Sequence, residues 1–160
     1  MPELERIQVT RRIPAKADRI FDLVRDPQVQ IQIDGSGMLI STPDGPMTAV
    51  GDAFEMNMDR EPLGDVPLGK YRVVNTVTRF VRDRHFEWNV AWPESPPFGH
   101  VYGYMLEPIN AVATDVSSYC DWSSLSEAWR GHIVFPVIPA SMLEDSLERL
   151  RQIAIGPPVG

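Results

Sequence analysis

The segment at residues 139–156 constrains the fold of this chain more than any other part of the sequence. Its apolar side chains recur at the spacing of one face of an α-helix: Leu143, Leu147, Leu150 and Ala154. Ser141 and Glu144 have the spacing of a capping box, which predicts where the helix begins. Gly156 and the prolines after it predict where the helix ends. A helix with one apolar face requires a second layer that buries this face.

Strand patterns in the rest of the chain can supply that layer. Residues 5–13 alternate apolar and polar side chains, as a strand does, and residues 15–26 have the spacing of a helix. Residues 28–33 fit a second short helix or a turn, and the less regular segment after the last strand fits a short helix at residues 125–129. Further strands are predicted at residues 38–41, 52–59, 71–80, 85–92, 100–106 and 114–122. Antiparallel strands joined by hairpins, with helices gathered on one face, make an α+β fold.

Size and charge exclude several classes of protein. The chain has 160 residues, the usual size of one domain, and a net charge of -7. Nucleic-acid binding is excluded because it requires clustered Lys and Arg side chains. No apolar run is long enough for stable membrane insertion, and residues 1–20 lack the pattern of a secretory signal, so a cytoplasmic protein is expected. The single cysteine, Cys120, allows no disulfide within the chain and is expected in the core.

Two sequence patterns that would indicate a bound cofactor or metal are incomplete. Residues 64–70 fit the first seven positions of a phosphate-binding loop, but the eighth is Tyr71, where Ser or Thr would bind magnesium. A strand pattern follows, although such a loop must lead into a helix. The histidines His85, His100 and His132 have none of the short spacings of metal ligands. No metal and no cofactor are therefore expected.

Aromatic side chains alternate along two of the predicted strands. One strand places three side chains on one face, His100, Tyr102 and Tyr104, and the strand before it does the same with Phe86, Trp88 and Val90. Faces that point inward would form either an apolar cavity with a few hydroxyl and imidazole groups or an ordinary packed core. Asn75 is an amide within a strand and is a further candidate, although the alternation does not decide which face of the sheet its side chain is on. The candidate ligand-binding residues are Asn75, Phe86, Trp88, Tyr102, Tyr104, Leu143 and Leu147.

Two carboxylates are candidates for a catalytic base. Asp34 precedes a Gly-Ser-Gly turn, where it would either form the turn or lie at the mouth of a cavity. Asp121 alternates with Tyr119 on the last predicted strand, and it would need a hydrogen-bond partner if it were buried.

The layout resembles one known superfamily over nearly the whole chain. The segments that carry the resemblance are IPAKADRIFDLVRDP, NTVTRFVRDRHFEW, GYMLEP and TDVSSYCDWS. They are similar to the START-like superfamily (SRPBCC), which includes Bet v 1, the polyketide cyclase/dehydrase proteins and lipid-transport proteins. The resemblance implies a helix-grip fold, in which a curved antiparallel sheet of about six to seven strands wraps around a long C-terminal helix. It also implies one or two short helices after the first strand and one ligand-binding domain over residues 1–160.

The resemblance implies two main functions, and no catalytic motif decides between them. The first is binding or carriage of a small hydrophobic or aromatic molecule in a cavity between the sheet and the C-terminal helix. The alternative is an enzyme similar to the polyketide cyclases, which closes a ring by aldol addition and dehydration. Tyr102, Tyr104 and His100 would then be the donors, with Asp34 or Asp121 as the base. A protein-interaction module is a third class, and either a monomer or a homodimer is compatible with the sequence.

Overall fold

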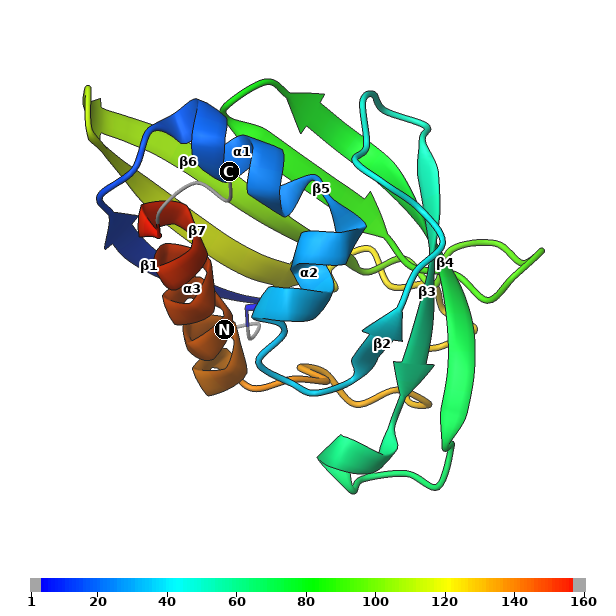
Figure 1. Ribbon diagram of the computed structural model, residues 1–160. Coiled ribbons are helices and arrows are strands. Elements are labelled where there is room, and N and C mark those ends of the chain that lie inside the picture. Colours follow the sequence, from blue (N-terminus) through cyan, green and yellow to red (C-terminus); the bar gives the residue numbers. More distant parts are fainter. Residues whose placement is uncertain (1–3, 157–160) are drawn as a thin grey trace.

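Seven strands form one antiparallel sheet in the computed structural model, which describes residues 4–156 (Figure 1). The strands are β1 (Arg6–Ile13), β2 (Leu39–Ser41), β3 (Ala53–Asp59), β4 (Lys70–Val81), β5 (His85–Asn89), β6 (Val101–Asn110) and β7 (Ala113–Asp121). Their order across the sheet is β1-β7-β6-β5-β4-β3-β2. Strands β2 to β7 therefore form a meander, and β1 adds to the far edge by pairing with β7.

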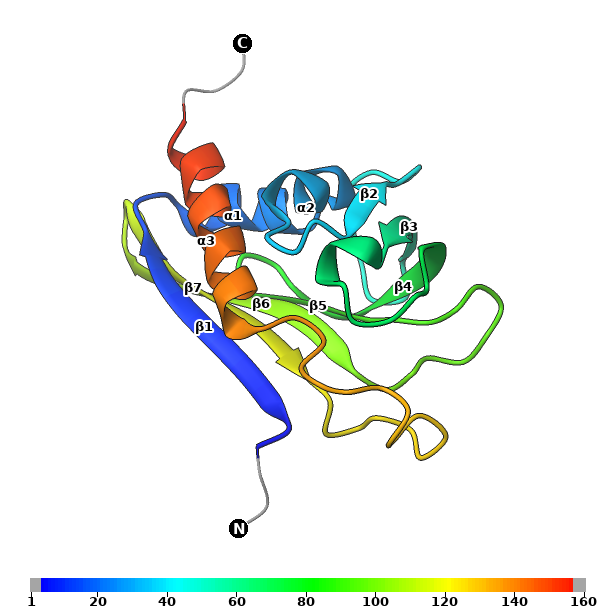
Figure 2. The same ribbon diagram turned by 90° about the horizontal axis from the view of Figure 1, so that it is seen from below.

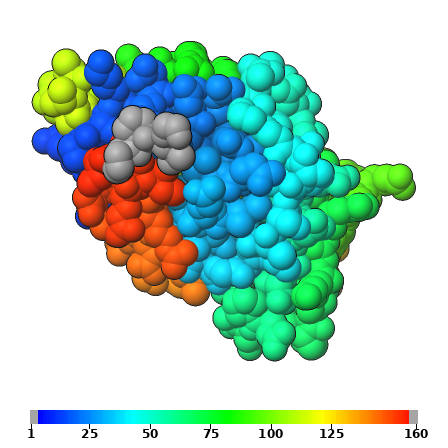
Figure 3. Space-filling model, in the orientation of Figure 1, coloured from blue at the N-terminus to red at the C-terminus, as the bar shows by residue number. Residues whose placement is uncertain are grey.

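The helices lie together on one face of this sheet. They are α1 (Ala17–Val24), α2 (Pro27–Ile33) and α3 (Ala140–Ile155), with a short 3-10 helix, η1 (Glu61–Leu63), between β3 and β4. Helix α3 packs against β1 and β7 and contacts both α1 and α2 (Figure 2). In the space-filling view the three helices form one continuous surface over the sheet (Figure 3). The prediction of an α+β helix-grip fold with short helices after the first strand is confirmed.

Local signals explain where α1 and α2 form. Helix α1 buries three apolar side chains on one face: Ile20, Phe21 and Val24. Helix α2 begins with Pro27 at its first position, and the Asp26 side chain accepts a hydrogen bond from the Gln28 backbone N–H at 3.0 Å. Both features favour a helix start, because proline needs no hydrogen bond there and the cap satisfies a free N–H group.

Helix α3 buries the predicted apolar face, but its start differs from the prediction. Leu143, Leu147, Leu150 and Ala154 are all buried. The capping box is wrong, because the helix already begins at Ala140 with Pro139 as the N-cap, and no side chain caps it. Ser141 is thus inside the first turn, where a capping side chain does not belong. The short helix expected at residues 125–129 is also wrong, since this segment has irregular backbone followed by a turn at residues 127–129.

One end of the space between helices and sheet is filled by packed aromatic rings. Phe21 of α1 meets Phe80 and Phe86 edge-on, with ring centroids 5.1 Å and 6.4 Å apart. Phe86 is fully buried and belongs to this packed cluster. Burying each such ring contributes about 1.5–3 kcal/mol to stability. This end of the core is therefore closely packed, and a binding site can form at the opposite end.

A tyrosine lies flat across the outer face of the sheet, away from the helices. Glu87, Gly103 and Tyr119 are paired across β5, β6 and β7. The Tyr119 hydroxyl donates to the Glu87 carboxylate and hydrogen-bonds His85 Nε2 at 2.7 Å, while Arg6 stacks over the ring. The ring passes over Gly103, where any side chain would collide with it. Glycine at this position thus makes the arrangement possible.

Within the residues that the structure describes, no helix is both long and apolar enough to cross a membrane.

Candidate ligand-binding site

The end of the fold opposite the packed aromatic cluster holds a cavity of about 600 Å³. Strands β3 to β7 supply one wall, helices α2 and α3 supply another, and two loop segments at residues 60–68 and 129–138 complete it. Most of the surrounding side chains are apolar or aromatic. A cavity of this size and make-up fits the usual pocket for a small molecule, which is mainly apolar with a few polar groups.

A row of aromatic rings forms the sheet wall of the cavity. Trp88 stacks on Tyr102 with ring centroids 6.2 Å apart, and the Tyr104 ring lies at the same distance from Trp88. Burial raises the pKa of both tyrosine hydroxyls, so each stays protonated at neutral pH. The wall therefore offers flat apolar surface and uncharged hydroxyl groups to a bound molecule.

His100 continues this aromatic row toward the loop side of the cavity. It is only 5% exposed, stacks on Phe98 and lies 4.9 Å from the Phe135 ring. Burial lowers its pKa to about 4, so the imidazole is neutral at pH 7. Its Nδ1 atom is buried and has no hydrogen-bond partner within residues 4–156. The side chain is thus a neutral polar group inside an aromatic environment.

Asn75 places an amide at the cavity from the middle of β4. The side chain is 5% exposed, and its Oδ1 atom has no hydrogen-bond partner in the described part of the chain. Buried polar groups are normally satisfied, so an amide at a cavity wall marks a position where a ligand or water can bind.

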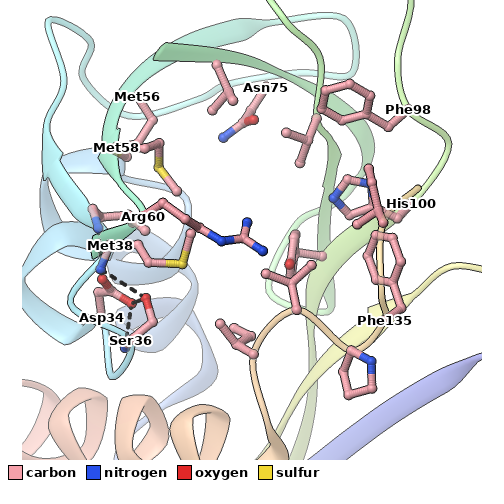
Figure 4. Close-up of a pocket in the computed structure, with 18 of the residues that line it drawn as sticks. Asp34, Ser36, Met38, Met56, Met58, Arg60, Asn75, Phe98, His100 and Phe135 are labelled. Atoms are coloured by element: carbon pink, nitrogen blue, oxygen red, sulfur yellow. Dashed lines mark hydrogen bonds between the residues drawn. The ribbon is translucent and has the colours of Figure 1, made fainter. Parts of the chain in front are cut away.

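A cation also points into the cavity. Figure 4 shows Arg60 extending into the pocket, with Asn75 to one side and His100 across the open space. Its Nε and Nη2 atoms donate to the Asp65 carboxylate at 2.9 and 2.8 Å. The hydrogen bond from Arg60 is the main cause that lowers the pKa of Asp65 to about 2, and the pair is therefore ionised at neutral pH.

The segment at residues 129–138 closes the cavity without forming a helix or strand. Trp129 meets Phe98 edge-on at 5.0 Å, and Phe135 stacks on Trp122 at 5.5 Å. Sequence reasoning missed this segment and Arg60, because neither lies within a periodic pattern. The available signal was composition, since residues 129–138 are rich in apolar side chains although they have no regular spacing.

The structure places the predicted ligand-binding residues in two groups. Those that line the cavity are Asn75, Trp88, Tyr102, Tyr104 and Leu143. Phe86 and Leu147 do not line it, and both are buried in the hydrophobic core. Both lie on the expected inner faces, and Phe86 packs against Phe21 and Phe80 at the filled end of the core.

The candidate bases are separated by the sheet. Asp34 is at the cavity with His100, but its carboxylate oxygens accept from the Ser36 N–H and hydroxyl and from the Leu39 N–H at 2.6–3.0 Å. It therefore forms the turn. Asp121 is not at the cavity, because its side chain pairs with Arg6 at 3.2 Å on the outer side of the sheet. Across residues 4–156, no group of three or more His, Cys, Asp or Glu side chains is placed to hold a metal ion.

Comparison with known proteins identifies the fold. No protein-family model and no curated protein matches the sequence. Solved structures match along almost its full length. The protein CV1439 from Chromobacterium violaceum shares 15% identity with a TM-score of 0.65, over 96% of this chain and 99% of that one. DR_A0006 from Deinococcus radiodurans shares 15% identity with a TM-score of 0.63, over 95% and 98%.

A third solved structure has a similar fold. Truncated norcoclaurine synthase from Thalictrum flavum shares 12% identity with a TM-score of 0.63, over 95% of this chain and 94% of that one. The fold is Bet v 1-like. At these identities the likeness concerns the Bet v 1-like fold alone, and one fold of this kind can host many functions.

Proposed function

We propose that this protein binds a small hydrophobic or aromatic molecule and carries it in the cavity between the sheet and α3. The main support is the cavity itself, about 600 Å³ in volume, with aromatic rings along one wall. Removing an apolar molecule from water into such a space is favourable by roughly 25 cal/mol per Å² of apolar surface buried. Three of the lining residues are tryptophans, Trp88, Trp92 and Trp129, which gives a built-in optical signal for binding.

The hydrogen bonds and positions of the two candidate carboxylates favour binding over ring-closing catalysis. The oxygens of Asp34 already accept three hydrogen bonds within its own turn, and Asp121 lies outside the cavity. Aldol closure requires a base next to the acidic carbon of the substrate. Neither candidate is free to take that position in this arrangement.

Titration with a neutral aromatic probe, 1-pyrenebutanol, tests this proposal. We expect the probe to quench tryptophan emission through energy transfer to pyrene, with saturation at one probe per chain and increased pyrene anisotropy. Linear uptake without saturation, or no uptake at all, would contradict the proposal.

Filling the cavity provides the matching test by mutation. Val73 and Val90 line the cavity, so Val73→Trp combined with Val90→Trp is expected to raise the Kd for 1-pyrenebutanol at least about tenfold. Val74→Trp is the control, because alternation along β4 places this side chain on the opposite face. Pyrene anisotropy measures binding in each variant, and equal Kd values in all three proteins would exclude the cavity as the binding site.

A further inference from the structure

Binding of a purely apolar molecule does not explain why the cavity contains a cation. The Arg60 side chain is only 14% exposed and extends into a space lined mostly by apolar groups (Figure 4). A guanidinium in such surroundings loses much of its hydration and is costly unless it is paired. Its position therefore requires a compensating negative charge.

The pairing present in the structure is incomplete. Asp65 engages Nε and Nη2 of Arg60. The Tyr71 hydroxyl also interacts with the guanidinium but brings no negative charge, because burial raises the pKa of Tyr71. Asp65 is 43% exposed and belongs to the loop between β3 and β4, so water competes with this ion pair. The guanidinium thus keeps a donor group available to a molecule in the cavity.

The other polar groups near Arg60 add no negative charge to that of the partly exposed Asp65. Burial lowers the pKa of His100 and raises the pKa of the lining tyrosines Tyr71, Tyr102 and Tyr104, so all of these groups are neutral at pH 7. The remaining carboxylate at the cavity, Asp34, is bound within its own turn. The amide of Asn75 adds a second buried polar group with an unpartnered atom, which faces the same space as Arg60 (Figure 4).

We propose that the ligand is an apolar or aromatic monocarboxylate, whose carboxylate binds Arg60 in the cavity while its body lies against the aromatic wall. This inference rests on the proposed function and adds the ligand's chemical class to it. A guanidinium matches a carboxylate in shape, and it can donate two parallel hydrogen bonds. One cation fits one negative charge, because a dianion would bring a second charge into an apolar space without a partner. Asp65 competes with the ligand for the same guanidinium.

The test compares 1-pyrenebutyrate with 1-pyrenebutanol, which have the same aromatic body and differ in the charged end. The readout is the ratio of the Kd for the butyrate to the Kd for the butanol, measured by pyrene anisotropy at pH 7. In Arg60→Met this ratio is expected to rise at least about tenfold, because a charge-assisted hydrogen bond is lost. In Asp65→Asn it is expected to fall at least about threefold, because a competing anion is removed.

Arg72→Met is the matched control, since Arg72 is exposed on the neighbouring strand and its loss changes the net charge equally. The ratio should then stay within about twofold of the original value. Arg60→Lys is a second variant that tests the proposal even if Arg60→Met does not fold. It keeps the positive charge but not the shape of the guanidinium, so its ratio should lie between those of the original protein and Arg60→Met.

Each outcome has a distinct meaning. An unchanged ratio in Arg60→Met, with both probes bound, would overturn the carboxylate proposal and leave the proposed function standing. Equal shifts in Arg60→Met and Arg72→Met would also overturn it, because net charge alone would then explain the effect. Failure of the unmodified protein to bind either probe would overturn the proposed function and this inference together.

Discussion

Gly103→Ala is expected to destabilise the protein by about 3 kcal/mol, near the upper end for overpacked positions. A Cβ atom at this position would lie 2.4 Å from the Tyr119 hydroxyl and 2.5 Å from the carbon that bears it. The ring cannot move aside easily, because it is 1% exposed and its hydroxyl is bonded to both Glu87 and His85. For a chain of this size the change corresponds to a fall in Tm of about 6–12 °C.

Thermal and urea unfolding of the variant measure this effect. Gly45→Ala is the control, since a Cβ atom there meets nothing within 4 Å and the backbone is not in the left-handed region. It should change stability by less than about 0.5 kcal/mol. Combining Gly103→Ala with Tyr119→Leu should make the two costs less than additive, because the leucine side chain is shorter than the ring. Full additivity would show that Gly103 is not needed to leave room for the Tyr119 ring.

Acidification from pH 7 to pH 4 is expected to cost about 3 kcal/mol of stability through His100 alone. Its pKa is about 4 in the folded protein, below the ordinary value of 6.5, because burial disfavours the charged imidazole. The unfolded chain therefore binds the proton first as the pH falls. The stability is fully present above pH 6.5 and is lost progressively toward the folded pKa near 4.

Urea unfolding at several pH values, in the original protein and in His100→Phe, isolates this effect. Carboxylates also contribute to acid sensitivity, so the informative quantity is the difference between the two curves. Phenylalanine keeps the stacking with Phe98 and does not titrate. The original protein should therefore lose about 3 kcal/mol more than the variant between pH 7 and pH 4. Parallel curves would mean that His100 is not buried in its neutral form.

The strands could be predicted because each follows a simple alternation. The sheet faces helices on one side, so inner positions are buried and outer positions are more exposed, as along β4. The apolar face of α3 followed from spacing in the same way. The helix start did not, because Ser141 and Glu144 have the right spacing but Pro139 already occupies the capping position.

The site was only partly predictable, because alternation gives the face of a strand and not the position along it. Phe86 and Trp88 share one face of β5, yet Phe86 packs under α1 and Trp88 lines the cavity. The difference depends on where α1 ends above the sheet, which is a property of the tertiary structure. Arg60 and residues 129–138 belong to loops, and their approach to the cavity depends on contacts distant in sequence.

The most direct test of an internal binding site is NMR of protein labelled with ¹³C at the methionine methyl groups. Among the methionines, Met38, Met56 and Met58 line the cavity, whereas Met47 and Met105 do not. Addition of 1-pyrenebutanol should shift the first three methyl signals through the ring current of pyrene and leave the other two unchanged. Shifts confined to Met47 or Met105, or no shift at any methionine, would contradict binding in this cavity.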